Sequence, residues 1–123
     1  MYDTEPFSEP DPSEVGSRID PVLARSWLLV NASQQDRFKA ASQSRADIVI
    51  LDIEDAVAPK DKDTARQNVV DWLAAGHSDW ARINGFGTPW WAADIDALKG
   101  TSIGGVMLAM VESVDHVTET ARR

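Results

Sequence analysis

Four short apolar runs, each followed by a helix-like segment, recur along the chain at intervals of roughly 25–30 residues, the size of one strand–helix unit. The runs span residues 26–30, 48–54, 80–84 and 104–111, and the helix-like segments span 35–44, 60–75, 90–98 and 114–123. The second run is continuously β-branched and aliphatic from Ile48 to Ile53 apart from Asp52, which is typical of a strand buried on both faces of a parallel sheet. Strand–helix alternation implies right-handed crossovers. The sequence therefore predicts an α/β fold with about four βα units and an all-parallel sheet.

The first 23 residues differ in composition from the rest. Pro6, Pro10, Pro12 and Pro21 stand among Asp, Glu and Ser, with few large apolar side chains. Such a segment cannot bury enough apolar surface to offset the entropy of ordering it. We expect residues 1–23 to be a disordered acidic tail and residues 24–123 to form the βα-repeat domain.

Composition limits the chemistry that is open to this chain of 123 residues. It has 12 basic and 20 acidic side chains, a formal net charge of −8, and this balance argues against a nucleic-acid partner. The absence of cysteine excludes disulfides and thiolate catalysis, and with two histidines a metal would have to use oxygen ligands, which favours Mg²⁺, with Mn²⁺ as the alternative. No apolar run approaches the ~20 residues of a membrane helix, so we expect a cytoplasmic protein without membrane contact.

Polar side chains follow the apolar runs, where a parallel α/β fold places its chemistry. The second run ends in Asp52, Glu54 and Asp55, the third carries Arg82 and Asn84, and the fourth is followed by Glu112. A two-residue period puts Asp52 and Glu54 on one face of their strand, and Arg82 and Asn84 on one face of theirs. We expect Arg82, Glu54, Asp55 and Glu112 to converge at one end of the sheet.

Each of these residues has a structural alternative. Glu54 and Asp55 are also favourable before a helix N-terminus. An arginine inside an apolar strand is rare unless paired, so Arg82 has an ion pair with an acid of the second strand as its structural explanation. Glu112 has the start of the last helix as its alternative.

Four sequence blocks resemble the citrate lyase beta subunit-like group of the HpcH/HpaI aldolase family. They are Arg25–Val30; Asp47 and Leu51-Asp52-Ile53-Glu54-Asp55-Ala56-Val57 with Pro59, Lys62, Ala65 and Arg66; Arg82-Ile83-Asn84-Gly85 with Thr88-Pro89-Trp90 and Asp94; and Gly105–Leu108 with Val111-Glu112-Ser113. The blocks occur in the family's order and spacing, from about Arg25 to the C-terminus.

The resemblance implies a TIM-barrel-like fold, half of a (β/α)₈ barrel, and a Mg²⁺-dependent carbon–carbon lyase. Its substrate would be an acyl-CoA or a 2-oxo acid. By the resemblance, Glu112 matches the metal ligand, Arg82 the substrate-binding and catalytic arginine, and Glu54 and Asp55 the acidic cluster that supports the metal and its waters. We assign Asn84 to substrate binding with Arg82.

Some features depart from the family pattern. The family's second metal ligand is an aspartate on a fifth strand, which would follow Arg123. Asn31-Ala32 replaces Pro-Gly or Pro-Ala, and Ala109-Met110 replaces Pro-Lys. These departures favour a second hypothesis, a truncated, non-catalytic homologue that binds a ligand or a partner chain.

A complete barrel needs ~250 residues, about twice this length. Three interpretations therefore stay open: a fragment of a longer lyase, a truncated paralogue, or a half that pairs with another chain. Half a barrel has two open sheet edges, which natural proteins rarely leave exposed. We therefore expect a homo-oligomer.

Overall fold

The computed structural model describes residues 20–123. The predicted disorder of residues 1–23 thus falls mostly outside the described residues. Residues 21–23 form a single 3₁₀ turn, η2 (Pro21–Leu23), which is capped by the Asp20 carboxylate accepting a hydrogen bond from the Val22 amide at 3.0 Å.

The predicted alternation of strands and helices is confirmed. The strands are β1 (Trp27–Asn31), β2 (Ile48–Asp52), β3 (Trp80–Ile83) and β4 (Gly105–Leu108). The helices are α1 (Phe38–Ser42), α2 (Lys62–Ala74), α3 (Trp91–Leu98) and α4 (Val114–Arg122), with short 3₁₀ turns η3 (Gln35–Arg37) before α1 and η4 (Pro59–Asp61) before α2.

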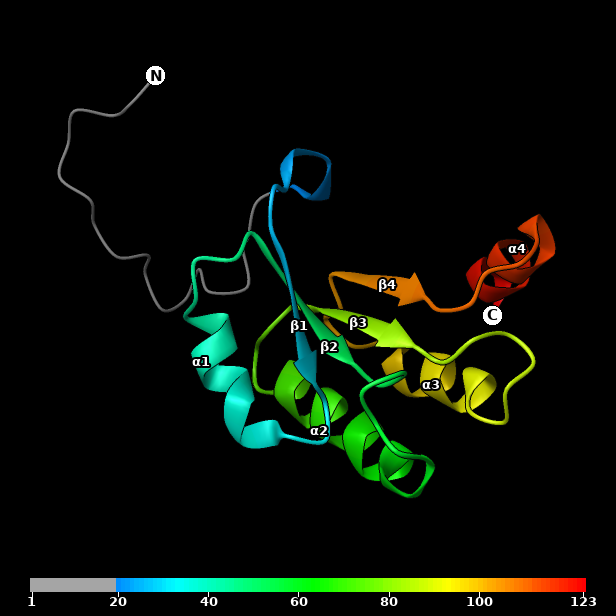
Figure 1. Ribbon diagram of the computed structural model, residues 1–123, viewed down its shortest axis with the longest axis horizontal. Coiled ribbons are helices and arrows are strands. Elements are labelled where there is room, and N and C mark those ends of the chain that lie inside the picture. The colour runs from blue at the N-terminus through cyan, green and yellow to red at the C-terminus, as the bar shows by residue number, and fades with distance from the viewer. Residues whose placement is uncertain (1–19) are drawn as a thin grey trace, which may run out of the picture.

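The sheet is parallel throughout, with its strands in the order β1-β2-β3-β4. Figure 1 shows α1, α2 and α3 together on one side of this sheet. Sequential parallel strands with helices on one side are the arrangement of half a (β/α)₈ barrel. The predicted four-unit α/β fold is therefore confirmed.

The core lies between the sheet and the helices. Its members are mainly aliphatic and small residues from every strand except β4, from the loops after β1 and β2, and from α1, α2 and α3: Val30, Ala32, Phe38, Ala41, Val49, Leu51, Ile53, Val57, Ala65, Val69, Leu73, Ala81, Ile83 and Leu98. Partly buried side chains, including Leu108 of β4, pack against this cluster. Burying these residues supplies the main stabilisation of the fold.

Aromatic side chains occupy the sheet face opposite the helices. Trp27 and Trp80 pair in register with the buried Ile48 and Ile50, and the two indole rings meet edge to face with centroids 5.3 Å apart. A Cβ on Gly105 would clash with the Trp80 ring, so any larger residue at that position in β4 would force the ring to move.

Three strands end earlier than the sequence predicted, β3 by one residue, β2 by two and β4 by three, all at the carboxyl end of the sheet where the site lies. β2 stops at Asp52 because the amides of Glu54 and Ala56 turn back to the Asp52 carboxylate. β4 stops at Leu108, and Met110 two residues later has a left-handed φ of 55°, which ends the extended backbone.

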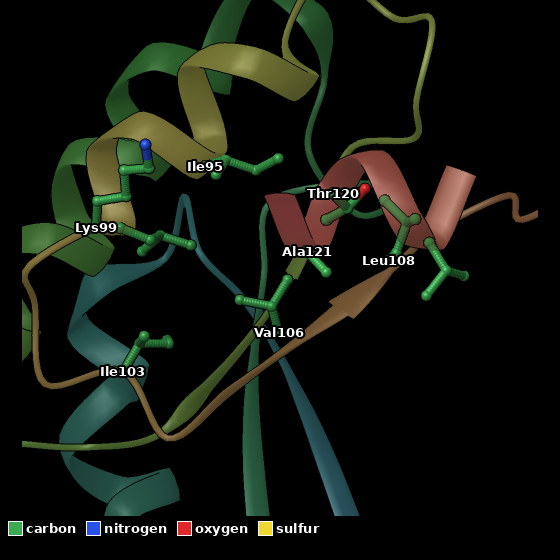
Figure 2. Close-up of a pocket in the computed structure, with 9 residues that line it drawn as sticks. Ile95, Lys99, Ile103, Val106, Leu108, Thr120 and Ala121 are labelled. Carbon is green, nitrogen blue, oxygen red and sulfur yellow. The ribbon is translucent and has the colours of Figure 1, made fainter. Parts of the chain in front are cut away.

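An apolar cavity of about 410 Å³ lies between α3, β4 and α4 (Figure 2). It is separate from the polar residues at the strand ends, none of which lines it. Within residues 20–123, no helix is long and apolar enough to cross a membrane.

Candidate functional site

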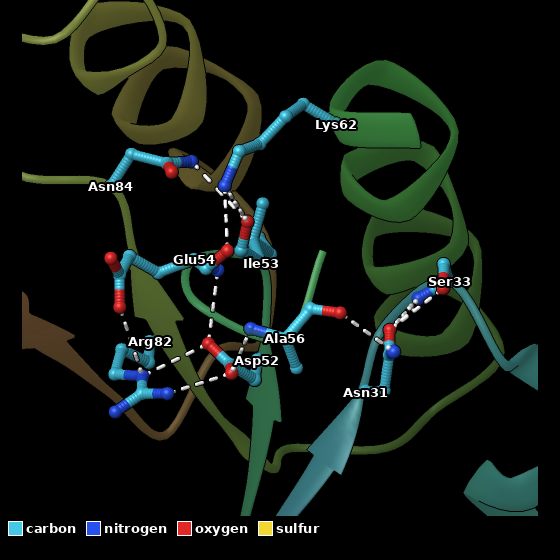
Figure 3. A network of polar contacts seen from close by, with 9 residues as sticks. All are labelled: Asn31, Ser33, Asp52, Ile53, Glu54, Ala56, Lys62, Arg82 and Asn84. Carbon is cyan, nitrogen blue, oxygen red and sulfur yellow. Dashed lines mark hydrogen bonds and ion pairs between the residues drawn. The ribbon is translucent and has the colours of Figure 1, made fainter. Parts of the chain in front are cut away.

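One register row crosses the sheet at its carboxyl end, on the face opposite α1, α2 and α3. It contains Asn31, Asp52, Arg82 and Met107. Within this row, Arg82 Nε and Nη2 donate to Asp52 Oδ1 and Oδ2 at 2.9 and 2.7 Å (Figure 3). Two parallel bonds of this kind fix both the position and the plane of the guanidinium.

Asp52 is the acceptor that organises the end of β2. Besides the two bonds from Arg82, its carboxylate accepts the amides of Glu54 at 2.9 Å and Ala56 at 3.2 Å. Burial acts to raise the pKa of Asp52, but the hydrogen bonds from Arg82 and the two amides outweigh it and hold the pKa below its usual value. Asp52 is therefore a carboxylate at neutral pH.

Arg82 interacts with the acidic side chains at the end of β2. The hydrogen-bonded Asp52 raises the pKa of Arg82 despite the opposing effect of burial, and the nearby charges of Glu54 and Asp55 raise it further. Glu54 Oε1 lies 3.7 Å from Arg82 Nε. The structure thus brings Arg82 and Glu54 together, with Asp55 exposed on the same turn.

The structural alternative for Arg82, an ion pair with an acid of the second strand, is present in the structure. This ion pair does not use every hydrogen-bond donor of the Arg82 guanidinium. The side chain is 23% exposed, and Nη1 makes no hydrogen bond to any of residues 20–123. Arg82 is therefore oriented by Asp52 and still able to donate to a ligand.

The loop after β2 is held from two sides by residues that were not assigned to the site from the sequence. Lys62, buried in the first turn of α2, donates from Nζ to the carbonyls of Ile53 at 3.1 Å and Glu54 at 2.6 Å. Asn31 donates from Nδ2 to the Ala56 carbonyl at 2.9 Å. The sequence signal for Lys62 is weak, because a lysine at the start of a helix is usually solvated.

Asn84, assigned to substrate binding from the sequence, is engaged inside the protein. It is buried, and Asp94 Oδ2 accepts both its backbone amide at 3.0 Å and its Nδ2 at 2.6 Å. Asp94 is itself fully buried and accepts from Arg66 Nε at 2.8 Å. This chain of contacts ties β3, α3 and α2 together, and it leaves Asn84 Oδ1 as the side-chain atom with remaining hydrogen-bonding capacity.

No hydrogen bond or ion pair among residues 20–123 joins Glu112 to this network. Glu112 is exposed in the loop between β4 and α4, where its amide donates to His116 Nδ1 at 3.3 Å. Among residues 20–123, no group of three histidine or acidic side chains is placed to hold a metal ion. Glu112 is therefore available as a single carboxylate ligand.

A family model described as HpcH/HpaI aldolase/citrate lyase matches residues 25–122, which include the whole strand-end network. The chain belongs to this family. The resemblance inferred from the sequence blocks is thereby confirmed, and with it the relation to carbon–carbon lyases.

Curated relatives extend well beyond the matched region. The chain is 41% identical over 97 residues to a citrate lyase subunit beta-like protein of Mycobacterium tuberculosis, covering 79% of this chain and 35% of that one. It is 40% identical over 79 residues to an L-malyl-CoA/beta-methylmalyl-CoA lyase of Rhodobacter capsulatus, covering 59% and 24%. The chain therefore spans about a third or less of the length of these relatives.

Solved structures show the same relation. CitE of M. tuberculosis in complex with magnesium, acetoacetate and coenzyme A is similar with a TM-score of 0.70 and 40% identity, covering 82% of this chain and 38% of that one. RipC of Yersinia pestis is similar with a TM-score of 0.64 and 30% identity, covering 84% and 42%. The fold described above matches part of each.

Proposed function

We propose that this chain supplies the substrate-binding half of a Mg²⁺-dependent carbon–carbon lyase that acts beside an acyl-CoA thioester or a 2-oxo acid. The observation that carries the proposal is the Asp52–Arg82 pair. It presents an oriented and partly exposed guanidinium at the carboxyl end of a parallel sheet. Relatives bound to coenzyme A, acetoacetate, oxaloacetate and pyruvate support the class of substrate.

The chemistry fits a guanidinium in this position. Breaking a carbon–carbon bond beside a carbonyl leaves the electron pair on the adjacent carbon as an enolate, whose oxygen becomes negative. A fixed cation stabilises that developing charge without reorganising. Arg82 would anchor the substrate's carboxylate or carbonyl oxygen through Nη1, while Asp52 keeps the guanidinium plane in place. Glu54 and Asp55 would add negative charge near the guanidinium and offset part of its positive charge.

The carboxylates of residues 20–123 provide part of a magnesium site. Asp52 is occupied by Arg82 and two amides, and Glu112 is the exposed carboxylate that we propose as a direct ligand. One carboxylate is compatible with Mg²⁺, which keeps several waters and recruits substrate oxygens. When bound there, the ion would supply Lewis-acid stabilisation of the enolate oxygen.

Titration of acetoacetate into the chain by NMR or calorimetry tests the role of Arg82. Arg82→Ala should weaken binding by roughly 1.5–3 kcal/mol, the worth of a charge-assisted hydrogen bond. Because alanine leaves Asp52 unpaired, Arg82→Lys is the companion variant, which keeps the charge but loses the two-point contact. Arg25→Lys, at the exposed amino end of the sheet, is the matched control and should bind like the parent. Equal affinity in Arg82→Lys and the parent would contradict the proposal.

A Mg²⁺ titration tests Glu112. Glu112→Gln should abolish the weak binding that we expect of the parent, because it removes the one direct ligand that we propose. Asp115→Asn changes an exposed acid three residues further on and should leave binding unchanged. If Glu112→Gln binds Mg²⁺ as the parent does, the metal assignment is wrong.

A second candidate function is a non-catalytic homologue that binds a ligand or a partner chain. The absence of a three-ligand metal cluster within the described residues favours it. The two functions make different predictions for the titrations. The non-catalytic homologue would bind a carboxylate ligand through Arg82 with the same affinity whether or not Mg²⁺ is present.

A further inference from the structure

The peptide unit between Ile53 and Glu54 is hydrogen-bonded at both of its ends (Figure 3). Its carbonyl oxygen accepts from Lys62 Nζ at 3.1 Å, and its amide donates to Asp52 Oδ1 at 2.9 Å. A peptide unit is planar and almost always trans, so its oxygen and its hydrogen point in opposite directions. The contact with Lys62 and the contact with Asp52 therefore restrain one plane from opposite sides.

Lys62 also holds the next peptide unit along the turn. Its Nζ donates to the Glu54 carbonyl oxygen at 2.6 Å, so one ammonium restrains two successive peptide planes. The planes on either side of a residue define its φ and ψ angles, and here that residue is Glu54. The direction of the Glu54 amide thus depends on a side chain that comes from α2.

The amides of this turn determine where the Arg82 guanidinium lies. Asp52 Oδ1 accepts from the Glu54 amide and from Arg82 Nε. Asp52 Oδ2 accepts from the Ala56 amide and from Arg82 Nη2. A carboxylate oxygen has about two acceptor sites, so each Asp52 oxygen is shared between one amide and one guanidinium nitrogen. The two amides fix the plane of the carboxylate, and the guanidinium follows that plane.

Lys62 is an unfavourable residue for its position by local criteria. It is 5% exposed, and it is the first residue of α2, at the positive end of the helix dipole. Burial of a charged group costs free energy unless that group is hydrogen-bonded. The two carbonyls and the Trp90 ring, centred 5.0 Å from Nζ, compensate for this cost. Residues that break local rules are expected at functional sites.

We propose that Lys62 is a positioning residue of the ligand site: its ammonium orients the Glu54 amide and, through Asp52, the plane of the Arg82 guanidinium. Because Lys62 is buried, it acts through Arg82 and not by contact with the ligand. The inference rests on the function proposed above for the ligand that Arg82 binds. The competing explanation is that Lys62 only stabilises the fold.

The Arg82 Nε–H signal in a nitrogen-edited NMR spectrum of the full chain reports on the guanidinium without any ligand. Arg82→Lys removes this signal and thereby assigns it. In Lys62→Met, which keeps a long unbranched side chain but has no ammonium, the signal should shift and exchange faster with water. If Lys62→Met does not fold, the same measurements are made on Lys62→Gln, which keeps one side-chain donor group.

Arg66 is an internal control in the same spectrum, because its Nε donates to the buried Asp94 at 2.8 Å, outside the turn after β2. Loosening of the whole fold would speed exchange at both arginines, whereas loss of positioning should affect Arg82 alone. Val69→Ala is the matched destabilised variant, since Val69 is a fully buried residue of α2. It should lower the free energy of unfolding and leave the Arg82 signal unchanged.

Acetoacetate titration supplies the second readout. Lys62→Met should bind about 10-fold more weakly than the parent, the lower end of the effect of removing a group that supports a ligand-binding side chain. Lys60→Met, a change at an exposed neighbour, and Val69→Ala should bind like the parent.

Three results would overturn the role of Lys62: an unchanged Arg82 signal in Lys62→Met, equal changes at Arg66 and Arg82, or a changed Arg82 signal with unchanged acetoacetate affinity. Each would leave Lys62 a purely structural residue, while the parent would still bind acetoacetate through Arg82. If the parent itself does not bind acetoacetate, the proposed function fails, and the Arg82 signal alone then decides whether Lys62 positions the guanidinium.

Discussion

The Arg82–Asp52 ion pair at the end of the sheet explains why an arginine is tolerated in an apolar strand, and it is also the basis of the role proposed for Arg82. The sequence indicated that an arginine in an apolar strand needs an acidic partner, and Asp52 is that partner. The choice of Asp52 over Glu54 or Asp55 follows from the register, which places Asp52 directly beside Arg82. Register was not available from the sequence, because it depends on how the strands slide against each other.

The lowered pKa of Asp52 predicts how stability depends on pH. A carboxylate with a depressed pKa in the folded state stabilises the protein above its ordinary pKa of about 3.8, and this stabilisation is lost as the pH falls through the folded value. Asp52→Asn should cost about 3 kcal/mol at pH 7, because it removes the charge that balances Arg82. The difference in unfolding free energy between the parent and the variant should begin to shrink as the pH falls below about 3.8, the ordinary pKa of the carboxyl, and should go on shrinking toward the lower folded-state pKa.

Urea unfolding from pH 7 to pH 3 measures this difference. Asp55→Asn, an exposed change three residues away, should stay within about 0.5 kcal/mol of the parent at every pH. A gap between the parent and Asp52→Asn that stays constant down to pH 3 would mean that titration of Asp52 does not contribute to stability.

Lys62 illustrates what residue patterns miss. Its place in the first turn of α2 gives it the pattern of a solvated lysine, yet it is buried with its ammonium on the carbonyls of Ile53 and Glu54 and 5.0 Å from the Trp90 ring centre. Those contacts exist only because the loops after β2 and β3 meet above the start of α2. Tertiary contacts of this kind have no local signature in a single sequence.

At the scale of elements, the sequence predicted every strand and α-helix but not where the strands end. Apolar composition continues past Leu108 in β4, so the pattern extended the strand to Val111, whereas the backbone turns at Met110. In β2 the end is set by the Asp52 carboxylate capturing two amides. The periodicity of the sequence predicts the middle of each strand and helix. The residue at which an element ends depends on individual side-chain contacts, which the periodicity does not show.

Asp94 is the residue that should matter most for joining elements. It is fully buried in the first turn of α3 and accepts hydrogen bonds from Asn84 of the β3 end and Arg66 of α2. Asp94→Ala should lower the free energy of unfolding by about 3–5 kcal/mol, because it removes the buried carboxylate that Arg66 and Asn84 share. Thermal or urea unfolding measures the loss.

The second ion-pair partner of Arg66 supplies a matched control for Asp94→Ala. Its other partner, Asp63, is 91% exposed at the side chain and pairs with Arg66 Nη1 at 3.0 Å. Asp63→Ala should cost no more than about 1 kcal/mol, since exposed ion pairs contribute little. Similar losses in the two variants would show that burial of Asp94 does not set the energy of this contact.

For the whole molecule, the sequence predicted four βα units and open edges, and the structure adds the shapes of those edges. Leu28 projects at one edge and an apolar cavity opens at the other. Neither shape could be predicted, because the cavity depends on how α3, β4 and α4 pack in three dimensions. Exposed apolar edges favour self-association. The net charge opposes it, because each chain carries −8 and two chains therefore repel each other.

This balance of charge and apolar contact predicts the salt dependence of self-association. The Debye length falls from about 30 Å at 0.01 M salt to about 3 Å at 1 M, so added salt screens the repulsion between chains and does not weaken contacts between the exposed apolar side chains of the sheet edges. The dimer dissociation constant from sedimentation should therefore fall as NaCl rises from 10 mM to 500 mM. Leu28→Asp, which removes the projecting side chain and adds a charge, should weaken the dimer at every salt concentration. Weaker association at high salt would mean that ion pairs, and not the exposed apolar side chains, hold the chains together.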